Sequence, residues 1–230
     1  MSTWINKATV GTLLRPGGWW PRFRRAEGAD RAASRLQAAP DALPAPPGTD
    51  LIWRPRLVSE AFSPDEMIDP DSGQRLGDDA ALWHDSRTGG LRLRQTAEDG
   101  AGAPHHLGID LEDFGGSYLS LSVDLPAEAL SGLSQAHILR VETVLRLDLP
   151  LRVYARLNVR HGPNTEELLR DLPLTGQQPP ERPAVEFDLA ATDLNEKRLE
   201  KIWLDLIFEQ PQGRIVLGDM ILSRHLRASF

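Results

Sequence analysis

Cysteine is absent from this chain of 230 residues, and tyrosine and methionine are scarce, with two and three residues respectively. Without cysteine, disulfide bonds and thiolate chemistry are excluded. Long hydrophobic runs are missing as well. No segment approaches the ~20 apolar residues of a membrane-spanning helix, and the N-terminal region lacks the continuous apolar stretch of a signal peptide. These absences favour a cytoplasmic protein without a transmembrane segment.

Charge is divided unevenly along the sequence. The net charge is −7, but residues 1–40 contain seven Lys and Arg against two Asp and Glu, a sum of +5, which leaves −12 for residues 41–230. An acidic body argues against nucleic acid as a partner, because the phosphate backbone would repel it. The basic N-terminal segment, by contrast, suits an anionic partner.

Residues 1–50 are predicted to form a basic, helical arm and a linker. Short helices fit residues 2–14 and 30–39, and four prolines between residues 40 and 50 indicate a stiff linker. Three aromatic residues interleaved with three arginines lie between the helices. They could dock to a protein partner or to an anionic membrane surface, peripherally at the inner membrane, or pack on the protein's own body. These candidate docking residues are Trp19, Trp20, Arg22, Phe23, Arg24 and Arg25.

Residues 51–230 are predicted to form one β-sandwich domain, because short alternating strands recur between turn signals. The fold class is therefore all-β: an antiparallel β-sandwich or jelly roll with short helical inserts and an N-terminal helical, basic extension. Helical inserts are expected after Ser63, at 126–133, from Asn164 and at 192–200. The predicted strands are 51–55 as an edge strand, 81–84, 90–96, 106–111, 117–125, 138–149, 151–160, 184–189, 202–208 and 214–222.

The stretch from Lys201 to His225 has the clearest local pattern. Its first half alternates Ile202, Leu204, Leu206 and Phe208 with Trp203, Asp205, Ile207 and Glu209, a period of two that places one set in a core. The sequence Gln210-Pro211-Gln212-Gly213 has the composition of a turn, and a second apolar run follows it. This pattern predicts a β-hairpin with one buried face.

The order of these strands resembles the closing half of galactose-binding-like jelly rolls, the fold of many carbohydrate-binding modules. The residues that carry the resemblance are the long strand 145–160, the short strand 185–189, the strand 202–208 and the final run 215–222. The Trp-rich N-terminus and residues 47–55 also resemble an alphaproteobacterial, and thus bacterial, family of unknown function. The resemblance to carbohydrate-binding modules implies a glycan ligand, and it makes Asp219 a candidate ligand of a structural calcium ion.

One face of the predicted sheet contains groups that suit a sugar. In modules of this fold an aromatic ring stacks on the sugar, while amide or charged groups bind its hydroxyls. If the leucine and valine set points inward, the opposite face presents the candidate ligand-binding residues Arg152, Tyr154, Arg156, Asn158, Trp203 and Asp205. The alternative is a solvated polar face on which one aromatic pair stabilises neighbouring strands.

Catalytic and metal-binding patterns are few. The acidic turn at residues 69–73 has carboxylates of the type that calcium requires, but Pro70 and the early Gly73 depart from the EF-hand pattern. The sequence contains no Gly-x-Ser-x-Gly, no phosphate-binding glycine loop and no His-Glu-x-x-His. We therefore assign no catalytic residue and no cofactor beyond the calcium candidate, and the question of catalysis stays open.

Two functions remain from the sequence. The first is a non-catalytic binding module for a glycan or another polyhydroxylated ligand, held on the face that contains Tyr154 and Trp203. The second is an assembly or scaffold protein that docks to a protein partner or an anionic membrane surface through its N-terminal arm. The position of Trp203 tests the first function, since a tryptophan in the inter-sheet core could not bind a ligand, and deletion of residues 1–45 discriminates between the two.

Overall fold

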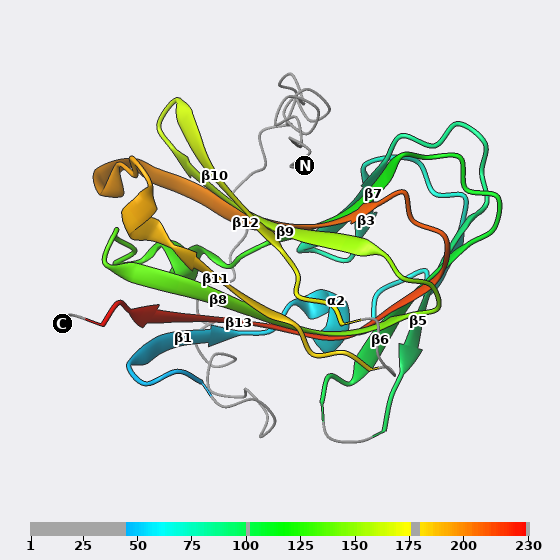
Figure 1. The fold of residues 1–230 in the computed structure, drawn as a ribbon, viewed down its shortest axis with the longest axis horizontal. Coiled ribbons are helices and arrows are strands. Elements are labelled where there is room, and N and C mark those ends of the chain that lie inside the picture. Colours follow the sequence, from blue (N-terminus) through cyan, green and yellow to red (C-terminus); the bar gives the residue numbers. More distant parts are fainter. Residues whose placement is uncertain (1–44, 100–101, 176–179, 229–230) are drawn as a thin grey trace, which may run out of the picture. The chain divides into compact units, whose positions relative to one another are not determined.

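Residues 45–99, 102–175 and 180–228 are described in the computed structural model, and they fold into two antiparallel β-sheets packed face to face (Figure 1). This architecture confirms the predicted all-β sandwich. The seven-stranded sheet has the order β11-β8-β13-β6-β5-β2, with β1 also paired to β13, and the six-stranded sheet has the order β10-β9-β12-β7-β4-β3.

The strand bounds agree with the ten predicted strands, but the strands at 66–68, 74–76 and 164–171 were not predicted. In the seven-stranded sheet they are β1 (Thr49–Trp53), β2 (Glu66–Ile68), β5 (Leu91–Ala97), β6 (His105–Leu111), β8 (His137–Leu147), β11 (Ala184–Asp188) and β13 (Gly213–Leu226). In the six-stranded sheet they are β3 (Gln74–Leu76), β4 (Ala80–His84), β7 (Tyr118–Asp124), β9 (Arg152–His161), β10 (Asn164–Asp171) and β12 (Leu199–Glu209). The described helices are short: α2 (Arg56–Ser59) and the 3-10 helices η1 (Ala127–Leu130), η2 (Leu189–Ala191) and η3 (Glu196–Arg198).

The core lies between the two sheets, where the predicted alternation places it. On β12, the four inward residues Ile202, Leu204, Leu206 and Phe208 are at most 1% exposed. Trp203 lies outside this core, on the opposite side of the strand. The alternation was therefore sufficient to identify which side of β12 faces the partner sheet.

The predicted hairpin at the end of the chain is wrong. Strand β12 pairs with β7 and β9 in the six-stranded sheet, whereas β13 pairs with β8, β6 and β1 in the other sheet. The turn at residues 210–213 thus crosses from one layer to the other. Alternation defines the buried face of each strand but not its neighbour, so a short turn fits a crossing as well as a hairpin.

Two of the predicted helical inserts are also wrong. Asn164 opens strand β10, which forms a hairpin with β9 around Gly162 (φ +59°). Ser63 and Pro64 precede strand β2, and no helix follows them.

The insert predicted at 126–133 forms η1, and the insert predicted at 192–200 is reduced to η3. The edge strand predicted at 51–55 is confirmed for residues 51–53 as part of β1, which among the described residues pairs with β13 alone, whereas Pro55 caps α2.

The boundary predicted at residue 50 falls inside β1, so the first sandwich strand begins two residues before the second predicted domain. The predicted helical arm at residues 1–44 and the greater part of its linker lie outside the described residues.

Helix α2 is joined to the six-stranded sheet by a buried carboxylate. Asp79, in the turn between β3 and β4, accepts a hydrogen bond from the backbone N–H of Arg56 at 2.7 Å through Oδ2, while its Oδ1 is buried without a partner. Burial raises the pKa of Asp79 to about 6, against the lowering effect of the backbone N–H groups. This carboxylate is therefore held in an environment that disfavours its charge.

Candidate functional site

Strand pairing places all six predicted ligand-binding residues on the outer face of the six-stranded sheet. The register of β9, β12 and β7 brings them into rows that run across the strands. These rows are Asn158, Trp203 and Asp124; Arg156, Asp205 and Ser122; Tyr154, Ile207 and Ser120; and Arg152, Glu209 and Tyr118. We call this surface the β9–β12 face.

Asp205 is the centre of a hydrogen-bonded cluster on this face. Its Oδ2 accepts hydrogen bonds from Arg156 Nε at 3.1 Å, Arg156 Nη2 at 2.8 Å and Asn158 Nδ2 at 2.9 Å. Arg156 also lies 3.6 Å from the carboxylate of Glu167 on β10. All three bonds within the cluster converge on Oδ2, so the lone pairs of Oδ1 are not used by the described residues.

The cluster is buried although its residues point away from the core. Asp205 is 4% exposed and Asn158 is 1% exposed. A carboxylate placed there without partners would be costly, and the Arg156 guanidinium together with the Asn158 amide supplies the compensating charge and donors. A pre-organised polar group of this kind is what a site needs in order to orient a polar ligand.

Two partly buried aromatic side chains flank the cluster. Trp203 lies opposite Asn158, and Tyr154 lies four residues along β9, with its hydroxyl donating to Glu209 at 3.4 Å. Lys201 Nζ lies 5.4 Å from the Trp203 ring centroid, so the cation covers one ring face. From strand spacing and rise, Trp203 and Tyr154 are about 14 Å apart at their Cα atoms.

Sequence reasoning missed several residues of this face, most of them contributed by β4 and β7. Trp83 lies opposite Ser120 and packs over Gly73, where an added Cβ would be 3.3 Å from the indole ring. Burial raises the pKa of Tyr118, and the Asp85 carboxylate adds to this effect. The strand at 81–84 was predicted, but its place beside β7 could not be, because no local pattern specifies that pairing.

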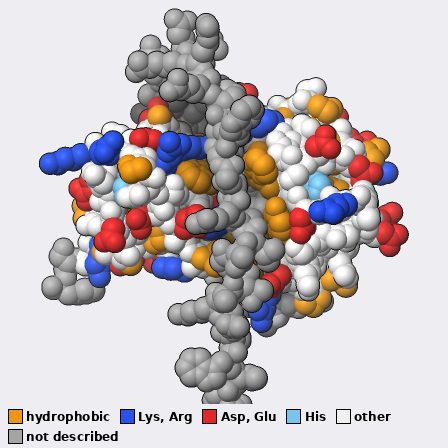
Figure 2. Space-filling model, turned by 90° about the horizontal axis from the view of Figure 1, so that it is seen from above, with side chains coloured by type: hydrophobic (Ala, Val, Ile, Leu, Met, Phe, Trp, Pro, Cys, Tyr) orange, Lys and Arg blue, Asp and Glu red, His pale blue; other side chains and the backbone are white. Residues whose placement is uncertain are grey.

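Figure 2 shows the molecule from the side of the six-stranded sheet, the side on which the β9–β12 face lies. In this view hydrophobic side chains lie interspersed with acidic and basic ones (Figure 2).

Asp219, the predicted calcium ligand, lies in the other sheet and pairs with an arginine. Arg54 Nε donates to Oδ1 at 2.9 Å, and Arg54 Nη2 donates to Oδ2 at 2.8 Å. Both side chains are nearly buried, so the guanidinium provides the positive charge that a cation would provide. Within the described residues no group of three or more His, Asp or Glu could hold a metal ion.

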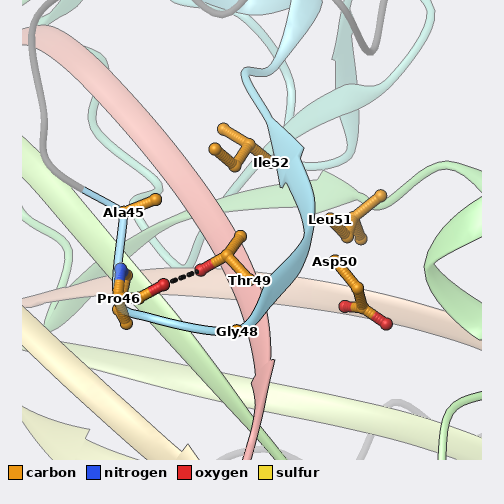
Figure 3. Close-up of a pocket in the computed structure, with 7 residues that line it drawn as sticks. All are labelled: Ala45, Pro46, Gly48, Thr49, Asp50, Leu51 and Ile52. Carbon is orange, nitrogen blue, oxygen red and sulfur yellow. Dashed lines mark hydrogen bonds between the residues drawn. The ribbon is translucent and has the colours of Figure 1, made fainter.

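A hollow of about 420 Å³ lies beside β1, and its described lining comes entirely from residues 45–52 (Figure 3). Thr49 Oγ1 donates to Pro46 O at 2.7 Å within it. Its one described ionisable group, Asp50, is held by Arg224 at 2.8 Å and 2.9 Å, and this partner lowers the pKa of Asp50. We assign it no binding role, since no second element supplies a facing described wall.

The predicted docking residues Trp19, Trp20, Arg22, Phe23, Arg24 and Arg25 lie outside the described residues. Docking through the arm therefore stays a prediction. Across the described ranges, no helix has both the length and the apolar character required to cross a bilayer.

Solved structures with a similar fold include two carbohydrate-binding modules and one phage protein. The CBM22-1 xylan-binding domain of Paenibacillus barcinonensis Xyn10C has a TM-score of 0.42 and 12% identity, with coverage of 71% of this chain and 94% of that chain. The family 11 carbohydrate-binding module of Clostridium thermocellum Lic26A-Cel5E has a TM-score of 0.41 and 10% identity, with coverage of 72% and 98%. The enzymatically active domain of bacteriophage CBA120 tailspike protein 4 has a TM-score of 0.45 and 8% identity.

The tailspike match covers 67% of this chain but only 21% of that protein. At such low identities and TM-scores these neighbours say nothing of the ligand, and the sandwich fold rests on the strand pairing itself. No curated protein matches the sequence. The predicted alphaproteobacterial origin is not tested by these matches. The family of unknown function DUF6478 matches residues 24–230, and the chain belongs to this family.

Proposed function

We propose that this protein is a binding module for a glycan or a similar polyhydroxylated ligand, which it holds on the β9–β12 face. The observation that carries the proposal is the Asp205 cluster, a buried carboxylate fixed by Arg156 and Asn158 through Oδ2 alone. Its Oδ1 is available to accept a hydrogen bond from a hydroxyl group. Charge-assisted hydrogen bonds of this kind are stronger than neutral ones.

The aromatic residues supply the second requirement. The apolar faces of a sugar ring need an aromatic surface close to the polar anchor, and Trp203 lies one row from Asp205 on the same side of β12. Lys201 Nζ lies over one face of the indole ring, and the proposal places the sugar on the other. Aromatic anchors beside a fixed polar group concentrate binding energy in few residues.

The proposal rests on this chain's own side chains. Carbohydrate-binding modules among the solved structures have a similar sandwich fold, but their ligands belong to those proteins. The described part of the β9–β12 face offers a carboxylate, an amide, a guanidinium and aromatic rings, and this set of groups is sufficient for hydroxyl recognition without a metal ion.

The test is isothermal titration calorimetry of the full chain with neutral tetrasaccharides built from glucose, xylose, galactose and mannose. We expect at least one to bind, and we expect Trp203→Ala to weaken binding at least tenfold, the equivalent of about 1.4 kcal/mol. Trp203→Phe, which keeps an aromatic face, should retain more affinity than Trp203→Ala. Circular dichroism and a urea unfolding curve check that both variants are folded.

Two results would contradict the proposal. The first is an absence of binding to every sugar tested. The second is a folded Trp203→Ala variant with unchanged affinity, which would place the ligand elsewhere on the molecule.

A further inference from the structure

We infer that the β9–β12 face selects neutral oligosaccharides against glycans that carry carboxylate groups; this inference rests on the proposed function. The inference follows from the ion pairs that the positively charged side chains of this face already form with protein carboxylates. A glycan carboxylate needs an arginine or lysine whose charge is not committed to a protein carboxylate.

The described strands of the six-stranded sheet present five outward-facing cations, and four of them have a carboxylate within 4.0 Å. Arg156 Nη2 is 2.8 Å from Asp205 and Arg156 Nη1 is 3.6 Å from Glu167. The remaining three ion pairs are Arg160 with Glu200 at 3.0 Å, Lys201 with Asp124 at 2.7 Å and Arg75 with Asp124 at 3.9 Å.

Arg152 is the fifth cation, and it also lies beside an acidic group. It pairs across the strands with Glu209, and a hydrogen bond with Tyr154 together with the Glu209 charge raises the pKa of Arg152. This cation stands at the far end of the rows, three rows away from Trp203. The positions nearest Trp203 and Asp205 on the described strands therefore offer no cation without a carboxylate within 4.0 Å, and Arg152, beside Tyr154, has the Glu209 charge opposite it.

Asp205 strengthens the discrimination. The accepting atom proposed for the ligand is its Oδ1, so a glycan carboxylate placed there would set two negative oxygens against each other in a partly desolvated site. Like charges in such an environment repel strongly, because solvent screening is reduced. A hydroxyl group, which can donate a proton to Oδ1, has no such penalty.

The spacing of the aromatic residues sets the size of the ligand. Trp203 and Tyr154 are one strand and four residues apart, a span of about 14 Å between Cα atoms. This span is longer than one monosaccharide ring, so a ligand that touches both rings and Asp205 is an oligosaccharide that crosses the strands obliquely.

The experiment compares matched probes on the full chain. Each neutral tetrasaccharide with primary alcohols is titrated beside the product in which those alcohols are oxidised to carboxylates, at low and at high salt. We expect the oxidised form to bind at least tenfold more weakly, and the difference to narrow as salt screens the repulsion.

The variant Glu167→Gln gives a more specific test, because it removes one carboxylate partner of Arg156 while leaving Asp205 in place. This variant should lower the selectivity against oxidised probes about threefold or more. Glu186→Gln is the matched control, since Glu186 pairs with Arg140 at 3.1 Å on the outer face of the other sheet. It should leave the selectivity unchanged.

The outcomes separate this inference from the proposed function. Equal or tighter binding of the oxidised probes, lost in both forms with Trp203→Ala, would overturn the selectivity while the β9–β12 face remained a glycan site. An unchanged selectivity in Glu167→Gln would also overturn the charge argument. No binding of any probe would overturn the proposed function as well.

Discussion

Two buried aspartates, one on each sheet, have arginine partners but differ in how their oxygens are used. Asp219 on β13 is held by Arg54 through both Oδ1 and Oδ2. Asp205 on β12 is held by Arg156 and Asn158 through Oδ2 alone, beside Trp203. Asp219 Oδ1 also accepts a hydrogen bond from the backbone N–H of Met220 at 2.8 Å, so both oxygens of the first carboxylate are used, whereas the second carboxylate retains an acceptor. The two pairs therefore differ in whether the carboxylate keeps an oxygen that no described group uses, as the proposed binding role of Asp205 requires.

Asp79 and Asp50 extend the comparison. Asp50 has a bidentate arginine partner, Arg224, and its pKa is lowered. Asp79 has backbone partners and a buried Oδ1 without a hydrogen bond, and its pKa is raised to about 6. Desolvation is thus the largest cause of the raised pKa of Asp79, whereas the hydrogen bonds from Arg224 are the largest cause of the lowered pKa of Asp50, which is also more exposed.

Removing the arginine from the saturated pair should have the largest effect. Arg54→Ala leaves Asp219 buried without a counter-charge, and we expect a loss of about 3–5 kcal/mol in the free energy of unfolding. Urea denaturation measures it. Arg156→Ala is the comparison variant and should cost less, since Asn158 and solvent at Oδ1 still serve Asp205. An equal loss in both variants would show that the two pairs do not differ.

The next effect concerns pH and Asp79. Its folded pKa lies above the ordinary value of 3.8, so its favourable contribution is fully present below pH 3.8 and is lost as pH rises through about 6. Asp79→Asn removes this penalty and should stabilise the protein at pH 8 by about 2–3 kcal/mol. Unfolding curves at pH 4.5 and pH 8 test it, and a gain of equal size at both values would contradict the titration of Asp79.

Sequence alone predicted much of the fold and the face but not the environment of its carboxylates. Alternation on residues 202–208 identified which side chains of β12 point outward, and the same pattern did so for β9. Nothing local could show that Asp219 meets Arg54, which is 165 positions away in the sequence. Nor could it show that β12 and β13 separate into different sheets, because pairing depends on contacts between distant strands.

The same substitution, made separately at each of the two aspartates, tests the comparison further. Asp205→Asn should weaken the binding of a neutral tetrasaccharide about tenfold, since it removes a charged acceptor, with a smaller change in stability. Asp219→Asn should do the reverse, lowering stability and leaving affinity intact. Calorimetry and urea unfolding on the same samples measure both effects. Loss of binding in Asp219→Asn would move the site to the other sheet.

The smallest effect is expected at the rim of the site. Glu167 is half-exposed, and its contact with Arg156 is 3.6 Å long. Glu167→Gln should therefore change the free energy of unfolding by less than about 1 kcal/mol, as is typical of exposed ion pairs. A loss as large as that of Arg54→Ala would mean that Glu167, and not Asp205, is the principal partner of Arg156.

The central claim, that Asp205 and Trp203 form a ligand site while Asp219 is structural, is tested most directly by nuclear magnetic resonance. A neutral tetrasaccharide that binds in calorimetry is titrated into the isotope-labelled full chain. The indole N–H of Trp203 and the side-chain amide of Asn158 should shift in proportion to occupancy, and the backbone amides of Asp219 and Met220 should not. Shifts confined to β13, with Trp203 and Asn158 unmoved, would contradict the account.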